Sequence, residues 1–538
     1  MMRFLPVNLN ALLVELDDLA QTLTLLASLQ NEPLAGIEEL VPAARTLLVH
    51  FRPAAVSHAE LIERIGRRNL TKAIERVGTL VEIPVDYHGE DLDEVAQLLQ
   101  LTREDVIALH TGREYSVAFT GFAPGFAYLS GGHPRLNVAR RATPRTRIPA
   151  GAVGLAGLFS GVYPRASPGG WQIIGVTATP MWDLSRAVPA LLQPGFKVRF
   201  IDAARRPRST AITVALQVKP AAAPVLIQAD GAALEIRRTG LQALFQDLGR
   251  YGQVAQGVSA SGAMDQGALR AANRLVGNPG NSACVEIVGG GFEFVCRGDV
   301  VIAITGAELP IHLTAGRDAT SPTNPTTPHW AVPGYQPIAL SDGDRLTLGE
   351  PRAGVRSYLA VRGGFRVDPV LGSCSTDTLA GLGPAPLAVG DVLAVTAVTR
   401  GAVVGSAEQP PADLPTTAQI VVLDVVMGPR TDWYTPEAVE LLARQLWTVT
   451  PQSNRVGLRL QGDQPLTRAD LAELPSEGTA LGAIQVPPNG QPVLFLADHP
   501  LTGGYPVIGA VAPHHLDRAG QIPVHAQVRF NPIRLFDF

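Results

Sequence analysis

The sequence predicts a mainly β protein of the α+β class, in which a small N-terminal α/β domain precedes β-barrels or sandwiches. Apolar residues recur at helical spacing mainly before residue 115, over residues 9–30 and 55–77. Beyond residue 115, short β-rich runs such as 172–177 and 196–200 alternate with glycine and proline turns, a spacing typical of barrels and sandwiches. A chain of 538 residues has room for about three to four such domains.

The N-terminal domain is expected to span residues 1–112. A further apolar run at helical spacing covers residues 92–99, and Thr102 is a plausible cap for the helix that follows it. Residues 46–51 and 81–87 have the composition of strands. Helices and strands thus alternate here, and we expect the first β domain to follow at residues 113–205.

Two breaks divide the remainder of the chain. Residues 206–229 are rich in arginine, proline and alanine, which is typical of a linker. Residues 406–415 form a second break, and it separates a domain at 230–405 from one at 418–538. The last domain begins with a β-like run at residues 420–426.

An internal similarity links the first and last β domains. Gly131 is followed twenty residues later by Gly151, and Gly462 is followed twenty residues later by Gly482, each of the latter opening a similar apolar run. Residues 170–175 also resemble residues 504–509. We expect the two domains to share one β fold, although glycine-rich turns also resemble one another by chance.

Composition excludes several classes of protein. The net charge of −4 gives no basic surface for a nucleic acid, and no apolar run reaches the roughly 18 residues that a membrane span needs. The three cysteines have no metal-ligand spacing. With no signal-peptide pattern at the start, we expect a cytoplasmic protein.

Two segments crowd glycine, aromatic and polar residues together without strand or helix periodicity. They are residues 119–131, FTGFAPGFAYLSG, and residues 246–265, which begin QDLGRYG and end SGAMD. Segments of this composition are typically loops that bend sharply and face a ligand.

Roughly residues 5–205 resemble the B subunit of 5-oxoprolinase, which is also described as the first subunit of the allophanate-hydrolase-like family. The similarity rests on Gly121–Leu129, on Pro144–Arg145 with Pro149–Gly151, and on residues 163–172. One departure is Thr120, because the family usually has leucine or isoleucine there.

About residues 230–535 resemble the C subunit of the same system. The motifs are Gln246–Gly252, Gly262–Asp265 and Ala272–Asn278, followed by 305–307, 372–376, 454–455, 476–478, 482–485 and 497–505. The chain therefore resembles a fusion of the B and C subunits.

The resemblance implies three cyclophilin-like β-barrels behind the small α/β domain, one in the first half and two in the second. It also implies ATP- and Mg-dependent opening of 5-oxoproline to glutamate, a small-molecule lactam substrate and a separate partner that resembles the A subunit of 5-oxoprolinase. Homo-oligomers are possible.

Lactam activation needs positioning and cations around the phosphoryl oxygens rather than covalent chemistry from the protein. The sequence has no P-loop, so glycine-rich turns and arginines are the candidates for binding ATP. Arg140, Arg141 and Arg145 lie close together in the sequence. They are either an anion-binding cluster or a solvated charged turn. The expected ATP or substrate residues of the first half are Gly121, Phe122, Pro124, Gly125, Phe126, Arg140, Arg141, Arg145, Gly169, Gly170 and Trp171.

In the second half, Asp265 could hold Mg²⁺ or orient water, or could cap a helix that begins directly after it. The other expected catalytic residues are Arg455 and Asp498, in a site between barrels with one aromatic and one hydrogen-bonding wall. The remaining expected substrate or ATP residues are Gln246, Arg250, Asn273, Gln485 and Tyr505.

The histidines add little to this site. His514 and His515 are adjacent, and on a strand their side chains would point apart, so no shared metal is expected. His133 lies beside the first glycine-rich loop and is either functional or a turn residue.

Three other functions fit the sequence less well. Amide hydrolysis of allophanate needs paired serines and a catalytic lysine, and Lys72, Lys197 and Lys219 lack that context. Carboxyl transfer to urea needs a biotin carrier and a biotin carboxylase, which this chain lacks and which would act in trans. The third function is regulatory, with one half inhibiting a sensor kinase and the other acting as its antagonist. A fusion argues against this function because it would join the inhibitor and its antagonist permanently.

Overall fold

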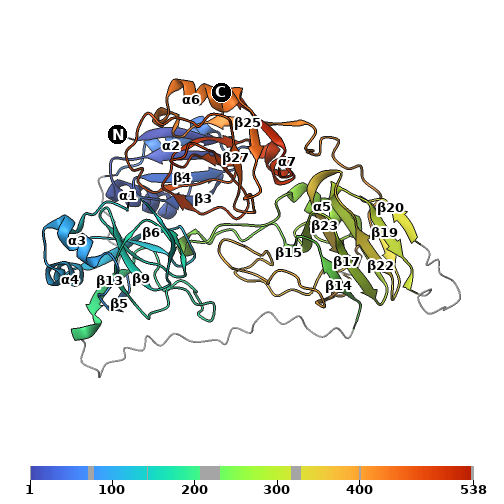
Figure 1. Cartoon of the computed structure of the whole chain (residues 1–538), viewed down its shortest axis with the longest axis horizontal. Coiled ribbons are helices and arrows are strands. Elements are labelled where there is room, and N and C mark those ends of the chain that lie inside the picture. Colours follow the sequence, from blue (N-terminus) through green and yellow to red (C-terminus); the bar gives the residue numbers. More distant parts are fainter. Residues whose placement is uncertain are drawn as a thin grey trace.

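The computed structural model describes residues 2–70, 78–141, 143–205, 231–316, 329–398 and 401–534. It is mostly β with few helices, as predicted. Figure 1 shows four packed units, which we call the N-terminal unit, the first barrel unit, the middle unit and the last barrel. The expected linker at 206–229 and the predicted helical residues 71–77 lie outside the described residues.

The N-terminal unit is an antiparallel sheet of strand order β1-β2-β4-β3 covered by two helices. Its core includes Leu25, Val49 and Leu61. The helix predicted over 9–30 is wrong in its first part, because residues 11–15 form a strand and the helix begins only after Asp18, whose side chain caps it. The elements are β1 (Arg3–Asn8), β2 (Ala11–Glu15), α1 (Leu19–Asn31), β3 (Ile37–Pro42), β4 (Thr46–Phe51) and α2 (His58–Gly66).

The first barrel unit is a seven-stranded sheet of order β12-β9-β10-β7-β6-β13-β5, and a bridge between Asp86 and Val176 joins its two edges. The predicted boundary at residue 112 is wrong, because β5 pairs in parallel with β13 and its apolar residues enter this unit's core. The capped helix start at Thr102 is confirmed. The elements are β5 (Leu80–Val85), α3 (Leu92–Leu99), α4 (Arg103–Thr111), β6 (Glu114–Thr120), β7 (Ala127–Ser130), η1 (Pro134–Leu136), β8 (Arg145–Ile148), β9 (Ala152–Ala156), β10 (Phe159–Val162), β11 (Ser167–Gly169), β12 (Gln172–Val176), β13 (Lys197–Asp202) and η2 (Ala203–Arg205).

The middle unit has two sheets, of orders β20-β19-β22-β17-β14-β24 and β15-β16-β23-β18-β21. It therefore differs from the single barrel expected for residues 230–405; both sheets bury apolar residues in one core between them. The elements are β14 (Ala233–Thr239), β15 (Gln242–Gln246), η3 (Val254–Gln256), α5 (Gln266–Val276), β16 (Cys284–Val288), β17 (Phe292–Arg297), β18 (Val300–Glu308), β19 (Ile311–Thr314), β20 (His329–Val332), β21 (Ile338–Leu340), β22 (Arg345–Leu348), β23 (Ala353–Val361) and β24 (Val392–Ala394).

The last barrel is closed, in the order β25-β32-β29-β30-β27-β26-β33. Its first and last strands pair in parallel, with Ile420 opposite Gln527. The elements are β25 (Ile420–Met427), η5 (Thr431–Trp433), α6 (Pro436–Arg444), β26 (Trp447–Val449), β27 (Gly457–Gln461), β28 (Glu477–Gly478), β29 (Ala483–Gln485), β30 (Val493–Phe495), β31 (Thr502–Gly503), β32 (Val507–Val511), η6 (Pro513–His515), α7 (Leu516–Gly520) and β33 (Gln527–Ile533).

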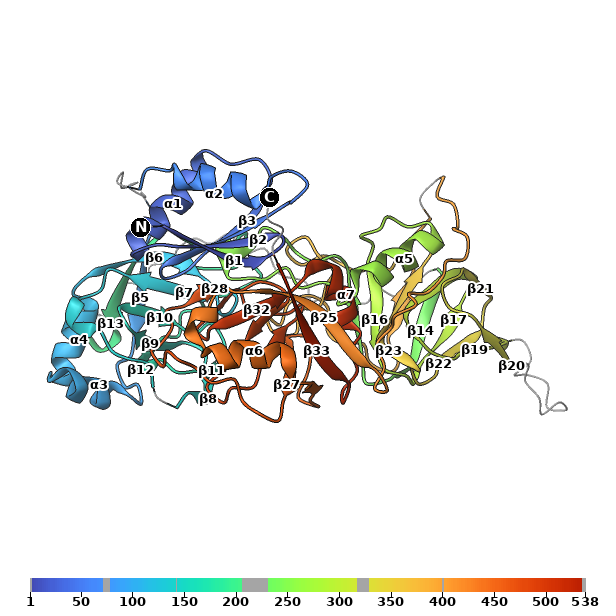
Figure 2. The ribbon, with the colours of Figure 1, turned by 90° about the horizontal axis from the view of Figure 1, so that it is seen from above.

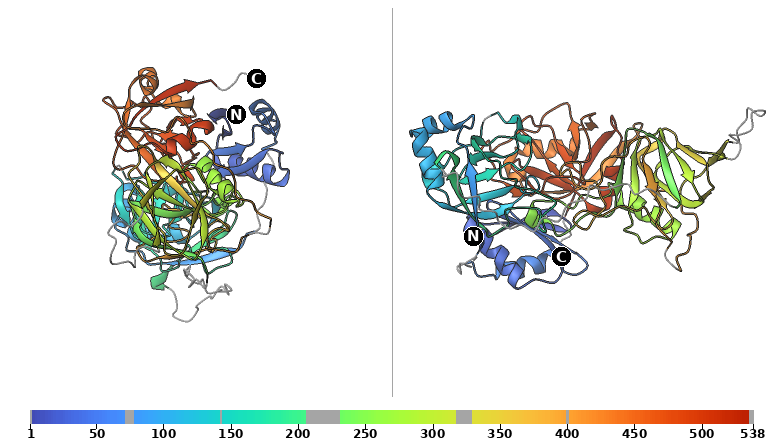
Figure 3. Two further views of the ribbon diagram at one scale, coloured as in Figure 1. Left: turned by 90° about the vertical axis from the view of Figure 1, so that its right-hand side faces the viewer. Right: turned by 90° about the horizontal axis from the view of Figure 1, so that it is seen from below.

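The last barrel lies between the first barrel unit and the middle unit along the length of the molecule (Figures 2 and 3). The N-terminal unit also packs on it, where Asn8 Nδ2 donates to Val511 O at 2.8 Å. In the described part of the chain, no helix has the length and apolar character to cross a membrane. The central position of the last barrel brings segments of the other three units to its surface.

Candidate active site

Both glycine-rich segments singled out in the sequence meet at the last barrel. Between β6 and β7, the backbone N–H of Phe122 donates to Thr502 Oγ1 at 3.1 Å. The N–H of Gly125 donates to Gln256 O at 2.8 Å. The middle unit's segment 246–265 thus packs against the first half's loop, and both lie beside the 498–505 segment of the last barrel.

The 121–126 loop is shaped by its backbone. Gly125 has φ of +76°, and a β-carbon there would lie 3.0 Å from Met181 O, so only glycine is accommodated easily. Phe122 also has positive φ, at +63°, a conformation that is uncommon for a bulky residue and often marks a functional site. Gly121 and Pro124 are buried in the same turn.

The loop is not a phosphate cradle in this conformation. Besides the two bonds above, the N–H groups of Gly121, Ala123 and Phe126 donate to backbone carbonyls of the loop itself. Because its N–H groups are engaged, the loop offers an anion few free donors. This corrects the expectation that Gly121–Gly125 binds ATP through backbone N–H groups.

The aromatic residues of the first half form a packed cluster rather than an open stacking wall. The Phe126 ring makes edge-to-face contacts with its neighbours, and Phe126 and Trp171 are 1% and 6% exposed. The space around Gly169 is filled by Tyr163. The rings packed around Phe126 are those of Phe122, Tyr128, Tyr163 and Trp171.

Two of the three clustered arginines are committed to a buried carboxylate. Arg145 binds Asp91 through two bonds of 2.8 and 2.6 Å, and Arg141 Nη1 binds the same carboxylate at 2.6 Å. Burial raises the pKa of Asp91, but the arginines and the N–H of Ile173 lower it further than burial raises it. Arg141 and Arg145 are therefore structural ion-pair partners, and neither a free anion site nor a solvated turn. Gly170 O accepts the backbone N–H of Arg141 in the same network.

Arg140 points the other way, into the last barrel. Its Nη2 donates to Ser476 Oγ at 3.1 Å, and its Nε lies 2.9 Å from Glu473. A β-carbon at Gly504 would lie 2.6 Å from Arg140 Nη1. A cavity of about 120 Å³ includes Ser476 and Trp433 in its wall, so it reaches this contact.

The predicted residues of the middle unit are buried and hold its loops together. Gln246 Nε2 donates to Thr376 O at 2.8 Å, and Asn273 Nδ2 donates to Ser282 O at 2.9 Å. Arg250 is 2% exposed and donates through Nη2 to Ser375 O, while its Nη1 has no hydrogen-bond partner among the described residues. Burial lowers the pKa of Arg250.

Asp265 caps a helix, which was the structural alternative for this residue. Its Oδ1 accepts the N–H of Ala268 at 2.8 Å at the start of α5, and its Oδ2 accepts Gln521 Nε2 at 2.8 Å. Burial and the nearby Asp517 raise the pKa of Asp265 to about 6. Each oxygen thus accepts one structural hydrogen bond, one from the helix start and one from the last barrel.

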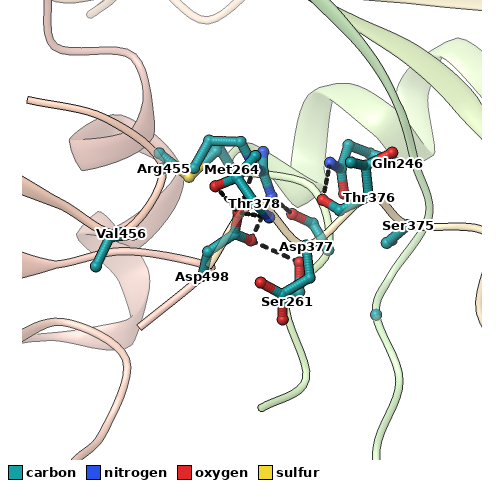
Figure 4. Close-up of polar contacts among 12 residues, drawn as sticks. Gln246, Ser261, Met264, Ser375, Thr376, Asp377, Thr378, Arg455, Val456 and Asp498 are labelled. Atoms are coloured by element: carbon teal, nitrogen blue, oxygen red, sulfur yellow. Dashed lines mark hydrogen bonds and ion pairs between the residues drawn. The ribbon is translucent and has the colours of Figure 1, made fainter. Parts of the chain in front are cut away.

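Arg455 and Asp498 form the buried centre of the junction between the last barrel and the middle unit (Figure 4). Arg455 binds Asp498 with two bonds of 3.0 Å, donates to Glu286 of the middle unit, and donates to Gly262 O at 2.5 Å. Burial raises the pKa of Asp498, but the Arg455 charge and its hydrogen bonds outweigh burial and lower it. Asp498 is therefore ionised and fixed.

The middle unit supplies the other hydrogen-bond donors to Asp498. Ser261 Oγ donates to it at 2.6 Å, and the N–H and Oγ1 of Thr378 donate at 2.8 and 2.7 Å. Ser261 has φ of +55° in the predicted 246–265 segment. Because both Asp498 oxygens are saturated, Asp498 does not fit a magnesium ion.

Sequence reasoning missed Asp377, which directly follows the 372–376 motif. It is 1% exposed, and its Oδ2 has no hydrogen-bond partner among the described residues. Burial and the Asp498 charge raise its pKa to about 7. The one signal in the sequence was a carboxylate inside a run of small and hydroxyl residues.

Asp377 also faces the first half of the chain. Arg165, between β10 and β11, lies against the Asp377 turn, since a β-carbon at Gly381 would lie 3.1 Å from Arg165 Nη1. Burial lowers the pKa of Arg165, and the charge of Asp377 opposes that effect. Arg165 Nε has no hydrogen-bond partner among the residues described.

Gln485 and Tyr505 lie on the side of the barrel next to Arg140. Gln485 Nε2 donates to Tyr505 O at 3.1 Å, and the Tyr505 side chain is the more exposed of the two. His133 accepts the N–H of Arg135 and caps η1, which is a structural role. The strand expected for His514 and His515 is wrong, because both lie on η6 and their rings are 4.5 Å apart.

Comparison with known families identifies both halves. The model of carboxyltransferase domain subdomains A and B matches residues 256–532, more than half of the chain. The model of subdomains C and D matches residues 2–192. The chain belongs to the carboxyltransferase-domain family.

Within this family, the two halves match separate curated proteins. The C subunit of 5-oxoprolinase from Escherichia coli is 36% identical over 303 residues, which are 55% of this chain and 90% of that protein. The B subunit of 5-oxoprolinase from Bacillus subtilis is 40% identical over 190 residues, 32% of this chain and 79% of that protein. The carboxyltransferase-family chain described here therefore joins a B-like half to a C-like half.

Two further relatives complete the comparison. The solved structure of TTHA0988 superposes with a TM-score of 0.80 at 32% identity and covers 99% of this chain and 100% of that one. Urea amidolyase of Saccharomyces cerevisiae is 31% identical over 324 residues, 57% of this chain but 17% of that protein. The curated relatives are thus named as subunits of 5-oxoprolinase and as urea amidolyase.

Proposed function

We propose that this protein is the fused B–C component of an ATP-dependent 5-oxoprolinase, which activates the lactam with Mg-ATP and acts with a separate protein that resembles the A subunit. The observation that carries the proposal is the composite junction. Arg165 of the B-like half and Asp377, Arg250, Arg455 and Asp498 of the C-like half meet at one buried place. A centre that needs both halves explains why both are present together.

The chemistry required is the O-phosphorylation of an amide. An electron pair of the lactam oxygen forms a bond to the γ-phosphorus, the bond between that phosphorus and ADP breaks, and the lactam N–H proton leaves. The products are ADP and an imidate that carries the phosphoryl group on the former lactam oxygen and has no charge on its ring nitrogen. A base that is ionised near neutral pH and positioned at the N–H assists such a step.

Asp377 fits the role of that base. Its Oδ2 is buried without a partner among the described residues, while Asp498 beside it is held ionised by Arg455. Two neighbouring carboxyls whose environments separate their pKa values are a recurrent acid–base arrangement. In this proposal Asp377 accepts the lactam proton and Asp498 stays a fixed charge.

The unsatisfied guanidinium groups suit the substrate's own carboxylate. Arg250 Nη1 and Arg165 Nε are buried donors with no partner in the described parts of the chain. A carboxylate satisfies such donors with charge-assisted hydrogen bonds. Since both oxygens of Asp498 are saturated by hydrogen bonds, Mg²⁺ enters the proposal as part of the Mg-ATP substrate and not as an ion bound by Asp498.

The test is ADP release by the purified chain with Mg-ATP, with and without 5-oxoproline, and with and without an A-like protein. Urea and allophanate serve as substrate controls. Oxoproline-dependent ADP release that rises when the A-like protein is added is the expected result. No ADP release with 5-oxoproline under any of these conditions would contradict the proposal.

A second candidate is carboxyl transfer to urea. It is favoured by the carboxyltransferase models that match both halves and by the similarity to urea amidolyase. Removal of an amide N–H proton is common to both reactions, so Asp377 would serve in either. Urea-dependent transfer from carboxybiotin, with biotin carboxylase and carrier supplied in trans, would select this function instead.

A further inference from the structure

A cluster of metal-ligating side chains lies on the last barrel, away from the Asp377 junction. Asp424 on β25 and the pair His514 and His515 on η6 bring one ligand atom each within 4.8 Å of one another. We infer that Asp424, His514 and His515 form a binding site for a divalent transition-metal ion. The inference does not depend on the proposed function.

The three side chains converge on one oxygen. His514 Nε2 lies 2.9 Å from Asp424 Oδ2, and His515 Nδ1 lies 3.8 Å from the same atom. A metal with ligand distances of about 2.0–2.2 Å holds neighbouring ligand atoms at about these separations. Two imidazoles and one carboxylate on one side of an ion leave other coordination positions open.

Outer hydrogen bonds already orient the carboxylate. Asn531 Nδ2 donates to Asp424 Oδ1 at 2.7 Å, and Asn531 stands opposite Asp424 in the parallel pairing of β33 with β25. This leaves Oδ2 directed toward the histidines. Such supporting bonds to a ligating carboxylate are a regular feature of metal sites.

His515 needs one local change to bind the metal. Its Nδ1 accepts the backbone N–H of Asp424 at 2.9 Å. The metal would replace that hydrogen bond, and a single neutral hydrogen bond contributes little beside a metal–imidazole bond. Asp424 and His514 are therefore the ligands present before binding, and His515 completes the site.

The surroundings favour a cation. A cavity of about 300 Å³ is lined by both histidines and gives room for water or a further ligand on the metal. Its wall carries the four acidic residues Asp265, Glu408, Asp413 and Asp517 against the two arginines Arg274 and Arg518. Nitrogen and carboxylate ligands in this setting suit Zn²⁺ or Co²⁺ rather than Mg²⁺ or Ca²⁺.

The chain contains a matched control. His88 Nδ1 lies 2.9 Å from Asp86 Oδ1, which reproduces the histidine–carboxylate pair at an exposed site. No second histidine accompanies that pair among the metal-ligating groups of the described residues. His88→Ala therefore removes a similar pair without removing the proposed site.

The experiment is a titration of the full, untagged chain with Co²⁺, followed by visible absorption and by metal analysis after dialysis, with Zn²⁺ as competitor. We expect one bound Co²⁺ that Zn²⁺ displaces. His514→Ala, and separately Asp424→Asn, should weaken binding by at least about tenfold, and His88→Ala should leave it unchanged. His514 is about half exposed, so its removal spares the fold.

Two results would overturn the inference. One is Co²⁺ bound in less than equimolar amount by the folded wild-type chain. The other is equal affinity in the wild type, His514→Ala and Asp424→Asn, which would place any bound ion elsewhere. Circular dichroism of each variant distinguishes loss of a ligand from loss of the fold.

Discussion

The first barrel unit and the last barrel have the same strand order, but they differ in the side chains that fill one end. Aromatic rings fill that end of the first barrel unit, and buried charges fill it in the last barrel. Read from β12 and from β32, the two sheets run β12-β9-β10-β7-β6-β13-β5 and β32-β29-β30-β27-β26-β33-β25, and each has its parallel pair at the end. Gly125 stands two residues before β7, and Arg455 stands two residues before β27. One barrel has a tight turn where the other has a buried cation.

The difference shows how a repeated fold acquires a site. Around Phe126 the first barrel unit fills its end with rings from its own strands and loops. The last barrel fills the corresponding end with Arg455 and Asp498, whose remaining partners are Glu286, Ser261, Gly262 and Thr378 of the middle unit. The rings around Phe126 all come from the first barrel unit, whereas the charged end takes its partners from the middle unit.

Arg455→Met should have the largest effect on stability. It leaves Asp498 and Glu286 buried without their cation, and breaking a buried pair in this way costs about 3–5 kcal/mol. The midpoint of urea-induced unfolding measures the loss. Arg459→Met on β27 is the matched control, because that side chain is exposed and its replacement should cost less than about 0.5 kcal/mol. Equal midpoints for the two variants would refute the importance assigned to the charged end.

Asp377→Asn should lower the rate of the proposed reaction by about 100-fold, the contribution of a general base. The fold should survive, because Oδ2 has no partner among the described residues to lose. Steady-state ADP release measures the rate, with the exposed Asp368→Asn as control. An unchanged rate for Asp377→Asn would remove Asp377 from the chemistry while leaving the ion pair of Arg455 intact.

The same variant should change the pH dependence. With a pKa near 7, Asp377 becomes a base as pH rises through 7, and the wild-type rate should rise with it. Its folded pKa lies above its ordinary value, so the folded state binds more protons and stability falls as pH rises toward and through 7. Asp377→Asn should flatten both trends. A rate profile identical to that of the wild type would contradict the assignment.

Asp91→Asn tests the charges of the first barrel unit, which lie at its rim rather than at the junction. Losing the charge that holds Arg141 and Arg145 should cost about 2 kcal/mol. Because the folded pKa of Asp91 is lowered, the stabilisation is present above its ordinary pKa and is lost as pH falls through the lower folded value. Unfolding midpoints at pH 7 and pH 3 should therefore differ from those of the wild type mainly at pH 7. The exposed Asp93→Asn should match the wild type at both.

Thr502→Val should have the smallest effect, about 1 kcal/mol. It removes the acceptor of the Phe122 N–H, one hydrogen bond between the two barrels. Thr467→Val, at an exposed position of the last barrel, should be neutral in the same unfolding assay. A loss as large as that of Arg455→Met would mean that the barrels are joined mainly through this loop.

Local features were predictable because they depend on neighbours in the sequence. The Thr102 cap, the strands at 46–51 and 172–177 and the internal similarity all follow from composition over a few residues. The parallel pairing of β5 with β13 was not predictable, because it joins strands more than one hundred residues apart. It is this pairing that moves residues 80–111 out of the N-terminal unit.

The sequence indicated which segments form the site, but it did not indicate the role of each charged residue in it. Arg455 and Asp498 are brought together as expected, but Arg141 and Arg145 are neutralised by Asp91, which precedes them by about fifty residues. Asp377 was missed because its importance comes from Arg165 and Asp498, which no local pattern connects to it. Burial and partners decide the role of a charged residue, and both are properties of the fold.

Among the described residues, contacts between the two halves are made far along the chain from the segment that links them covalently. Asn8 with Val511, Arg140 with Ser476, and Arg430 with Glu15 each join a residue of the B-like half to one of the C-like half. A protease cut between the halves should therefore leave a complex rather than two separate fragments. The peptide connection supplies effective concentration, so the fusion matters most where the protein is dilute and least where separately encoded subunits are abundant.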